Sequence, residues 1–127
     1  MSDLKRHVLV VDDEFLIVMG LTEQVEEMGL IVCGSAATAD KAVEMARLHR
    51  PMLVLMDMRL DGEKDGVDAA LVINEELGSK VIFITGSRDP STVVRIRQDH
   101  PSGILFKPVS NQQLRAAIDA AIGLGVS

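Results

Sequence analysis

Five residues of this chain carry groups that could cooperate in chemistry, and each lies at the end of a short apolar run. Asp12 and Asp13 follow "HVLVV", Asp57 closes "MLVLMD", Thr85 closes "KVIFIT" and Lys107 closes "GILFK". A charge at the end of a buried run is expensive to desolvate, so packing alone does not explain these residues. Carboxylates, a hydroxyl and an ammonium group are the groups that bind a divalent metal ion and a phosphoryl group.

The apolar runs predict β-strands at 7–12, 30–34, 52–57, 80–85 and 103–107. They are continuous rather than alternating, which is typical of strands covered on both faces. Helical patterns between them predict helices at 14–28, 39–49, 66–77, 90–99 and 111–122. Helix signals support these ranges: Gly29 and Gly78 as stops, Thr38 and Asp89-Pro90 as starts, and Ser110 with Gln113 as a capping box. On the third helix we expect the core side to carry Val67, Ala70, Leu71, Asn74 and Leu77.

Five alternating strand–helix units predict a single α/β domain with a parallel sheet between two layers of helices. A chain of 127 residues has room for this unit and little else. Ligands of such sheets bind beyond the carboxyl ends of the strands. We therefore expect the five chemical residues to meet on one rim of the sheet.

Three carboxylates on one rim repel each other, by about 4 kcal/mol for a pair at about 4 Å in a medium of intermediate polarity. A divalent cation or the ammonium group of Lys107 would relieve this repulsion. The ligands are oxygen atoms, with no His or Cys at the strand ends, which favours Mg²⁺ or Mn²⁺ over zinc. Asp12, Asp13 and Asp57 are the candidate metal ligands.

A metal ion, a lysine and a hydroxyl group around one carboxylate suit phosphoryl transfer, because they can neutralise the charge on the transferred group. Asp57 would be the nucleophile and would form an aspartyl phosphate. Thr85 would donate a hydrogen bond to the attached phosphoryl group, and Lys107 would contact it.

Composition excludes several other classes of function. The net charge of −6 and the three aromatic residues argue against a nucleic-acid partner, which would need a basic face or stacking platforms. The single cysteine excludes an internal disulfide and a cysteine-rich zinc site. The chain has no apolar run long enough to span a membrane, so no membrane partner is expected and a cytoplasmic location is the default.

Taken together, "VLVVDDE" (8–14), "MDMRL" (56–60) with "DG" (65–66), "ITG" (84–86) and "FKP" (106–108) resemble the receiver domain of bacterial response regulators. The resemblance covers essentially the whole chain. It implies a flavodoxin-like sheet of order 2-1-3-4-5 over residues 1–127, with a core of about 6–123 and no output domain. It also implies that the chain takes no separate substrate and is not an enzyme in the usual sense.

The resemblance assigns roles to the site residues. Asp57 would accept phosphate from a phosphohistidine on a sensor histidine kinase or a histidine phosphotransfer protein, and the product would change contacts with a downstream protein. The backbone carbonyl of Arg59 would add a metal ligand, and Lys107–Pro108 would be a cis peptide bond. The fifth strand of receivers usually carries a switch aromatic where this chain has Ile104, and Phe106 lies two residues further on.

The loop after Asp57 also departs from the family pattern. Leu60 replaces a usual methionine, Asp61 replaces a usual proline, and the loop to the "DG" pair is one residue longer. The geometry of residues 58–66 therefore does not follow from the resemblance.

The first predicted helix has apolar residues on the side opposite its core stripe. Phe15, Leu16 and Met19 cluster there beside the acidic rim, if each residue turns the helix by about 100°. Exposed apolar patches often mark partner surfaces. We expect the phosphodonor to dock on this patch, with coverage by a chain terminus or a homodimer contact as the alternative.

Two other functions remain open from the sequence. An Mg²⁺-dependent phosphohydrolase could use the same aspartate nucleophile, but haloacid dehalogenase-type enzymes carry a second aspartate at the position of Arg59. A degenerate receiver could bind its partners without phosphorylation.

Overall fold

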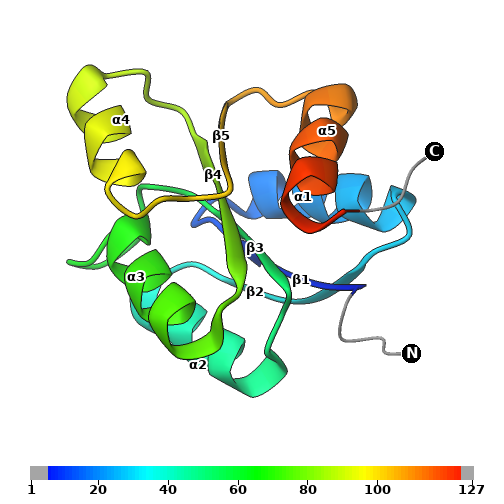
Figure 1. Cartoon of the computed structure of the whole chain (residues 1–127), viewed down its shortest axis with the longest axis horizontal. Coiled ribbons are helices and arrows are strands. Elements are labelled where there is room, and N and C mark those ends of the chain that lie inside the picture. The colour runs from blue at the N-terminus through cyan, green and yellow to red at the C-terminus, as the bar shows by residue number, and fades with distance from the viewer. Residues whose placement is uncertain (1–5, 124–127) are drawn as a thin grey trace.

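A computed structural model describes residues 6–123 as a five-stranded sheet flanked by helices (Figure 1). The strands are β1 (His7–Val11), β2 (Ile31–Ala36), β3 (Leu53–Met56), β4 (Lys80–Thr85) and β5 (Gly103–Phe106). Every neighbouring pair runs parallel, in the order β2-β1-β3-β4-β5. The predicted α/β architecture and the 2-1-3-4-5 order are confirmed, and predicted strand ends lie within two residues of the observed ones.

The helices form one layer on each face of the sheet (Figure 1). On one face, α1 (Phe15–Glu27) and α5 (Asn111–Ile122) share an apolar core with Val8, Val10 and Leu55. On the other face, α2 (Ala39–His49), α3 (Gly66–Leu77) and α4 (Pro90–Arg97) pack over Leu9, Val54 and Phe83. All four residues of β3 are buried, as its continuous apolar sequence predicts.

The predicted helix starts are confirmed by their hydrogen bonds. The side chain of Thr38 accepts a bond from the Lys41 backbone, and Asp89 accepts one from Ser91. Ser110 and Gln113 form a capping box at the start of α5. The sequence pattern missed a second capping box, in which Asp65 and Asp68 begin α3. These caps satisfy backbone N–H groups that the first turn of a helix leaves unpaired.

The predicted core side of α3 is wrong at two positions. Leu71 is 42% exposed and Asn74 is also exposed, whereas Ala69 and Ile73 are buried. The start of the helix fixes its rotation. A Cβ atom on Gly66 would collide with the backbone carbonyl oxygen of Asp57, so this side of the helix must face the sheet. Within residues 6–123, no helix is long and apolar enough to cross a membrane.

Candidate functional site

The parallel ladder itself brings the predicted residues to one end of the sheet. The backbone N–H of Asp57 donates to the carbonyl of Val11, next to Asp12, over 2.9 Å. The N–H of Lys107 donates to the carbonyl of Thr85, also over 2.9 Å. Because these bonds continue the pairing of β1 with β3 and of β4 with β5, the rim predicted from the strand ends is confirmed.

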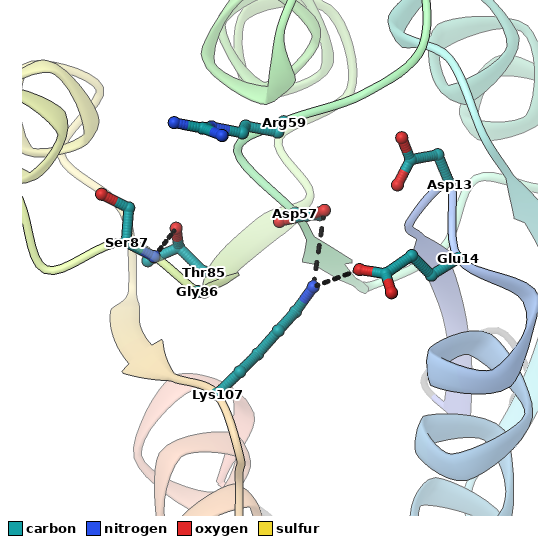
Figure 2. Close-up of a pocket in the computed structure, with 8 residues that line it drawn as sticks. All are labelled: Asp13, Glu14, Asp57, Arg59, Thr85, Gly86, Ser87 and Lys107. Carbon is teal, nitrogen blue, oxygen red and sulfur yellow. Dashed lines mark hydrogen bonds and ion pairs between the residues drawn. The ribbon is translucent and has the colours of Figure 1, made fainter.

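Asp12 lies behind the site rather than in its opening. Its side chain is 1% exposed, with one oxygen accepting from the backbone N–H of Glu14 at 2.9 Å and the other from the Lys107 ammonium at 2.8 Å. A cavity of about 650 Å³ opens in front, lined by Asp13, Glu14, Asp57, Arg59, Thr85, Gly86, Ser87 and Lys107 (Figure 2). Asp12 is therefore engaged by the protein, while Asp13 and Asp57 face the cavity.

The acidic group has the composition and spacing of a metal site. Asp12, Asp13 and Asp57 each offer a carboxylate oxygen, and these atoms all lie within 4.8 Å of one another. Oxygen donors at this spacing fit a hard divalent cation. The Asp13 carboxylate is exposed beside the two buried ones, so an ion could reach the group from the cavity.

Asp57 is a buried carboxyl group, with 6% of its residue surface exposed. Burial raises its pKa to about 6; the neighbouring Asp12 charge also raises it, and Lys107, 3.5 Å away, partly opposes both. Burial disfavours the charge of Lys107, but hydrogen bonding to Asp12 and the charge of Asp57 outweigh this, so the Lys107 pKa lies above its usual range. The site therefore holds the Lys107 ammonium close to the buried carboxylates of Asp12 and Asp57, which have lost part of their hydration.

Thr85 lies across the cavity from Asp13 (Figure 2). It is 2% exposed, and its hydroxyl oxygen accepts the backbone N–H of Ser87 at 3.1 Å. The hydroxyl hydrogen therefore remains available to a group bound in the cavity.

Three lining side chains were not predicted. Glu14 lies 3.9 Å from the Lys107 ammonium, the Arg59 side chain extends across the top of the cavity, and Ser87 lines it from the β4–α4 loop (Figure 2). Glu14 and Ser87 stand one and two residues beyond predicted site residues, and Glu14 closes the "VLVVDDE" motif, but neither side chain was assigned a role. The Arg59 side chain had no such signal, since its expected contribution was its backbone carbonyl.

The loop after Asp57 folds back toward the β2–α2 connection. The N–H of Asp61 donates to the carbonyl of Ala37 at 3.2 Å, and the N–H of Gly66 donates to the carbonyl of Met58 at 2.8 Å. Gly62 adopts a φ of +96°, which favours glycine. These contacts give the loop a defined path.

The fifth strand has Ile104 at the position where receivers usually carry the switch aromatic, and an aromatic residue lies nearby. Ile104 is half-buried against the core on the α2–α3–α4 face. Phe106 is the register partner of Thr85, and its ring lies under the Arg88 guanidinium at 4.4 Å. The Lys107–Pro108 peptide bond is cis, as expected.

The apolar patch on α1 is confirmed as a surface feature. Phe15 is 74% exposed, Leu16 79% and Met19 53%. Leu16 also lines a groove of about 380 Å³ that extends to Pro108 and Val109, in the segment that follows β5. The patch and this groove lie beside the acidic rim.

Comparisons with known proteins agree with this geometry. A family model described as the response regulator receiver domain matches residues 8–119. PdtaR, a transcriptional regulatory protein of Mycobacterium tuberculosis, is 37% identical over 92% of this chain and 57% of its own length. The phyllosphere-induced regulator PhyR of Methylorubrum extorquens is 32% identical over 95% of this chain and 45% of its own. The chain thus spans about half the length of these curated relatives.

Solved structures give the same result. The signal receiver domain of a modulated diguanylate cyclase from Desulfovibrio desulfuricans superposes with a TM-score of 0.86 at 36% identity, covering 91% of this chain and 92% of that one. The receiver domain of PhyR from Erythrobacter litoralis gives 0.80 at 32% identity, over 90% and 87% of the two chains. The chain belongs to the response regulator receiver domain family of two-component signalling.

Proposed function

We propose that this chain is a phosphoacceptor whose Asp57 takes a phosphoryl group from a phosphohistidine. The observation that carries the proposal is the setting of Asp57. Its carboxylate is buried at a strand end yet opens onto the cavity, with Lys107 at 3.5 Å and Asp13 within the same acidic group. A packing role alone would not place a carboxylate there.

The transfer requires few groups from the protein. A carboxylate oxygen of Asp57 attacks phosphorus, an O–P bond forms and the P–N bond to the donor imidazole breaks. The electron pair of the broken bond returns to the imidazole, which takes up a proton. The receiver therefore positions the nucleophile and neutralises charge, and it acts on no separate substrate.

The acidic group of Asp12, Asp13 and Asp57 would hold Mg²⁺, or Mn²⁺ in its place, together with the backbone carbonyl of Arg59. When bound, the ion supplies positive charge to the phosphoryl oxygens. Lys107 would turn from Asp12 toward the phosphoryl group, since its flexible stem carries a single charge that can reach either partner. Thr85 would donate its hydroxyl hydrogen to the same group.

The α1 patch of Phe15, Leu16 and Met19 would receive the phosphodonor, a histidine kinase or a histidine phosphotransfer protein. Its exposure beside the acidic rim supports this, because the donor histidine must reach Asp57 while its protein rests nearby. We expect Phe15→Ser with Met19→Ser to slow transfer from the protein donor by about tenfold and to leave acetyl phosphate unaffected. Equal slowing with both donors would contradict the docking role.

The experiment that tests the function is intact mass after incubation with acetyl phosphate and Mg²⁺. The proposal predicts one added phosphoryl group in the wild type and none in Asp57→Asn. Absence of the adduct with Mg²⁺ binding intact would instead support a receiver that works without phosphorylation. Steady turnover of a small phosphate ester would support a phosphohydrolase. Downstream contacts would then be compared between the two forms of the protein.

A further inference from the structure

Helix α4 is held to the rest of the domain by few contacts. Of its eight residues only Ile96 is buried, and Val94 is 58% exposed. In Figure 1 it stands apart from α2, at the edge of its layer beside β4 and β5. A short helix with one buried anchor has little apolar contact to fix its position, so polar contacts must contribute much of its positional stability.

One such contact is a fork of hydrogen bonds from Arg95. Its guanidinium donates to both carboxylate oxygens of Asp65, at 2.9 and 3.1 Å, and to Asp68 at 3.2 Å. Burial raises the pKa of Asp65, but hydrogen bonds from Arg95 and from the Asp68 backbone outweigh this and hold it below its usual range. A bidentate arginine–carboxylate pair is directional, so it can fix the orientation of α4.

The acceptor of this fork is joined directly to the phosphoacceptor segment. Asp65 caps α3 and exchanges capping-box bonds with Asp68. The next residue, Gly66, packs so tightly on the backbone of Asp57 that a Cβ atom would not fit, and its N–H donates to the Met58 carbonyl. Through Asp65 and its neighbour Gly66, Arg95 therefore connects α4 to the backbone of Asp57 and Met58.

The first turn of α4 is connected to Thr85 by a second set of bonds. The hydroxyl of Thr85 accepts the Ser87 N–H, and the hydroxyl of Ser87 accepts the Asp89 N–H at 3.2 Å. Asp89 in turn caps α4 through Ser91. If Thr85 moved toward a phosphoryl group on Asp57, these hydrogen bonds would shift the first turn of α4. Arg95 would meanwhile hold the second half of the helix in place.

We propose that Arg95 is a clamp that holds α4 against the start of α3 in the unphosphorylated protein, and that phosphorylation of Asp57 releases it. The release rests on the proposed function, because it needs a phosphoryl group that draws in Thr85. The clamp itself does not, since its three hydrogen bonds join Arg95 only to Asp65 and Asp68, and these residues do not line the cavity. Arg95 is thus a positioning residue outside the cavity.

The test is hydrogen exchange of the α4 amides, residues 91–97, with and without acetyl phosphate and Mg²⁺, with phosphate incorporation followed in parallel by intact mass. In the unphosphorylated protein Arg95→Ala should speed exchange of these amides about fivefold, while the buried β3 amides stay unchanged. Arg95→Lys, which keeps the charge but not the fork, should fall between Arg95→Ala and the wild type. Phosphorylation should speed α4 exchange in the wild type and add little in Arg95→Ala.

Arg97→Ala is the matched control. Arg97 is an exposed residue of the same helix for which the described residues show no ion pair, so its variant should exchange like the wild type. Unchanged α4 exchange in Arg95→Ala, or equal acceleration in Arg97→Ala, would overturn the clamp. A wild type that takes up phosphate without faster α4 exchange would overturn the release alone. Absence of phosphate uptake would overturn the proposed function and the release. The clamp would still be tested by comparing α4 exchange in Arg95→Ala and in the wild type without acetyl phosphate.

Discussion

The ammonium nitrogen of Lys107 lies 2.8 Å from a carboxylate oxygen of Asp12, closer than its 3.5 Å distance to Asp57. The lysine expected to contact a phosphoryl group is therefore already paired with the most deeply buried acid of the site. This pairing leaves Asp57 only partly neutralised, in keeping with its raised pKa. The same lysine can balance the site at rest and turn toward a phosphoryl group later.

Removing this lysine should destabilise the metal-free protein. Lys107→Met leaves Asp12 and Asp57 buried without their cation, which we expect to lower the free energy of unfolding by about 3 kcal/mol. Urea unfolding in EDTA measures the loss, and Mg²⁺ should restore part of it. Lys41→Met, which removes an exposed pair with Glu44, is the control and should change stability by no more than about 0.5 kcal/mol. Equal effects of the two variants would contradict the role given to Lys107.

Asp57 should make stability depend on pH in a defined direction. Its pKa is about 6 in the folded protein, against 3.8 for the free group, so between these values the folded state holds the proton more tightly. The wild type should therefore lose stability as the pH rises from about 4 to about 6, and the loss should be complete above that range. Asp57→Asn removes this titration.

The measurement is urea unfolding of both proteins in EDTA across that range. Relative to the wild type, Asp57→Asn should gain on the order of 2 kcal/mol between about pH 4 and pH 7. A stability difference that does not change with pH would show that the carboxyl group titrates normally.

Metal affinity should depend on Asp13 because its carboxylate faces the cavity. Asp13→Asn should weaken Mg²⁺ binding about tenfold or more, since the ion loses a charged ligand. Isothermal titration calorimetry suits the measurement, because the chain has no Trp or Tyr to report binding by fluorescence. Asp40→Asn removes an exposed acid on α2 that pairs with Lys64 of the following loop, and it should leave the affinity unchanged. A normal affinity in Asp13→Asn would place the ion elsewhere.

The grouping of the site residues was predictable from the sequence, because a parallel sheet brings the carboxyl ends of its strands together in space. Asp12, Asp57, Thr85 and Lys107 met as expected for that reason, with no knowledge of the loops. The contacts of Arg95 were not predictable, because its partner Asp65 is 30 residues away in the sequence and lies at the end of the loop that precedes α3. Arg88 over Phe106 was missed for the same reason: strand register is regular, whereas loop side chains depend on tertiary packing.

The exposed Leu71 shows a second limit of sequence patterns. Apolar spacing located the helix, but its rotation was set by the close approach of Gly66 to Asp57. Gly66→Ala should therefore destabilise the protein by about 2 kcal/mol or more and slow phosphorylation by acetyl phosphate. Gly20→Ala is the matched control, since a Cβ there meets no atom within 4 Å. It should raise the free energy of unfolding by about 0.5 kcal/mol through helix propensity. A well-tolerated Gly66→Ala would contradict the tight packing beside Asp57.

The central claim, that Asp57 is the residue that carries the phosphoryl group, is tested most directly by borohydride trapping. Borohydride reduces an aspartyl phosphate to homoserine, and trypsin releases residues 48–59, in which Asp57 is the only acidic side chain. After incubation with acetyl phosphate and Mg²⁺, we predict homoserine at position 57, with none when EDTA replaces Mg²⁺. Homoserine at Asp12 or Asp13, or an unmodified 48–59 peptide from protein that has gained the mass of a phosphoryl group, would contradict it.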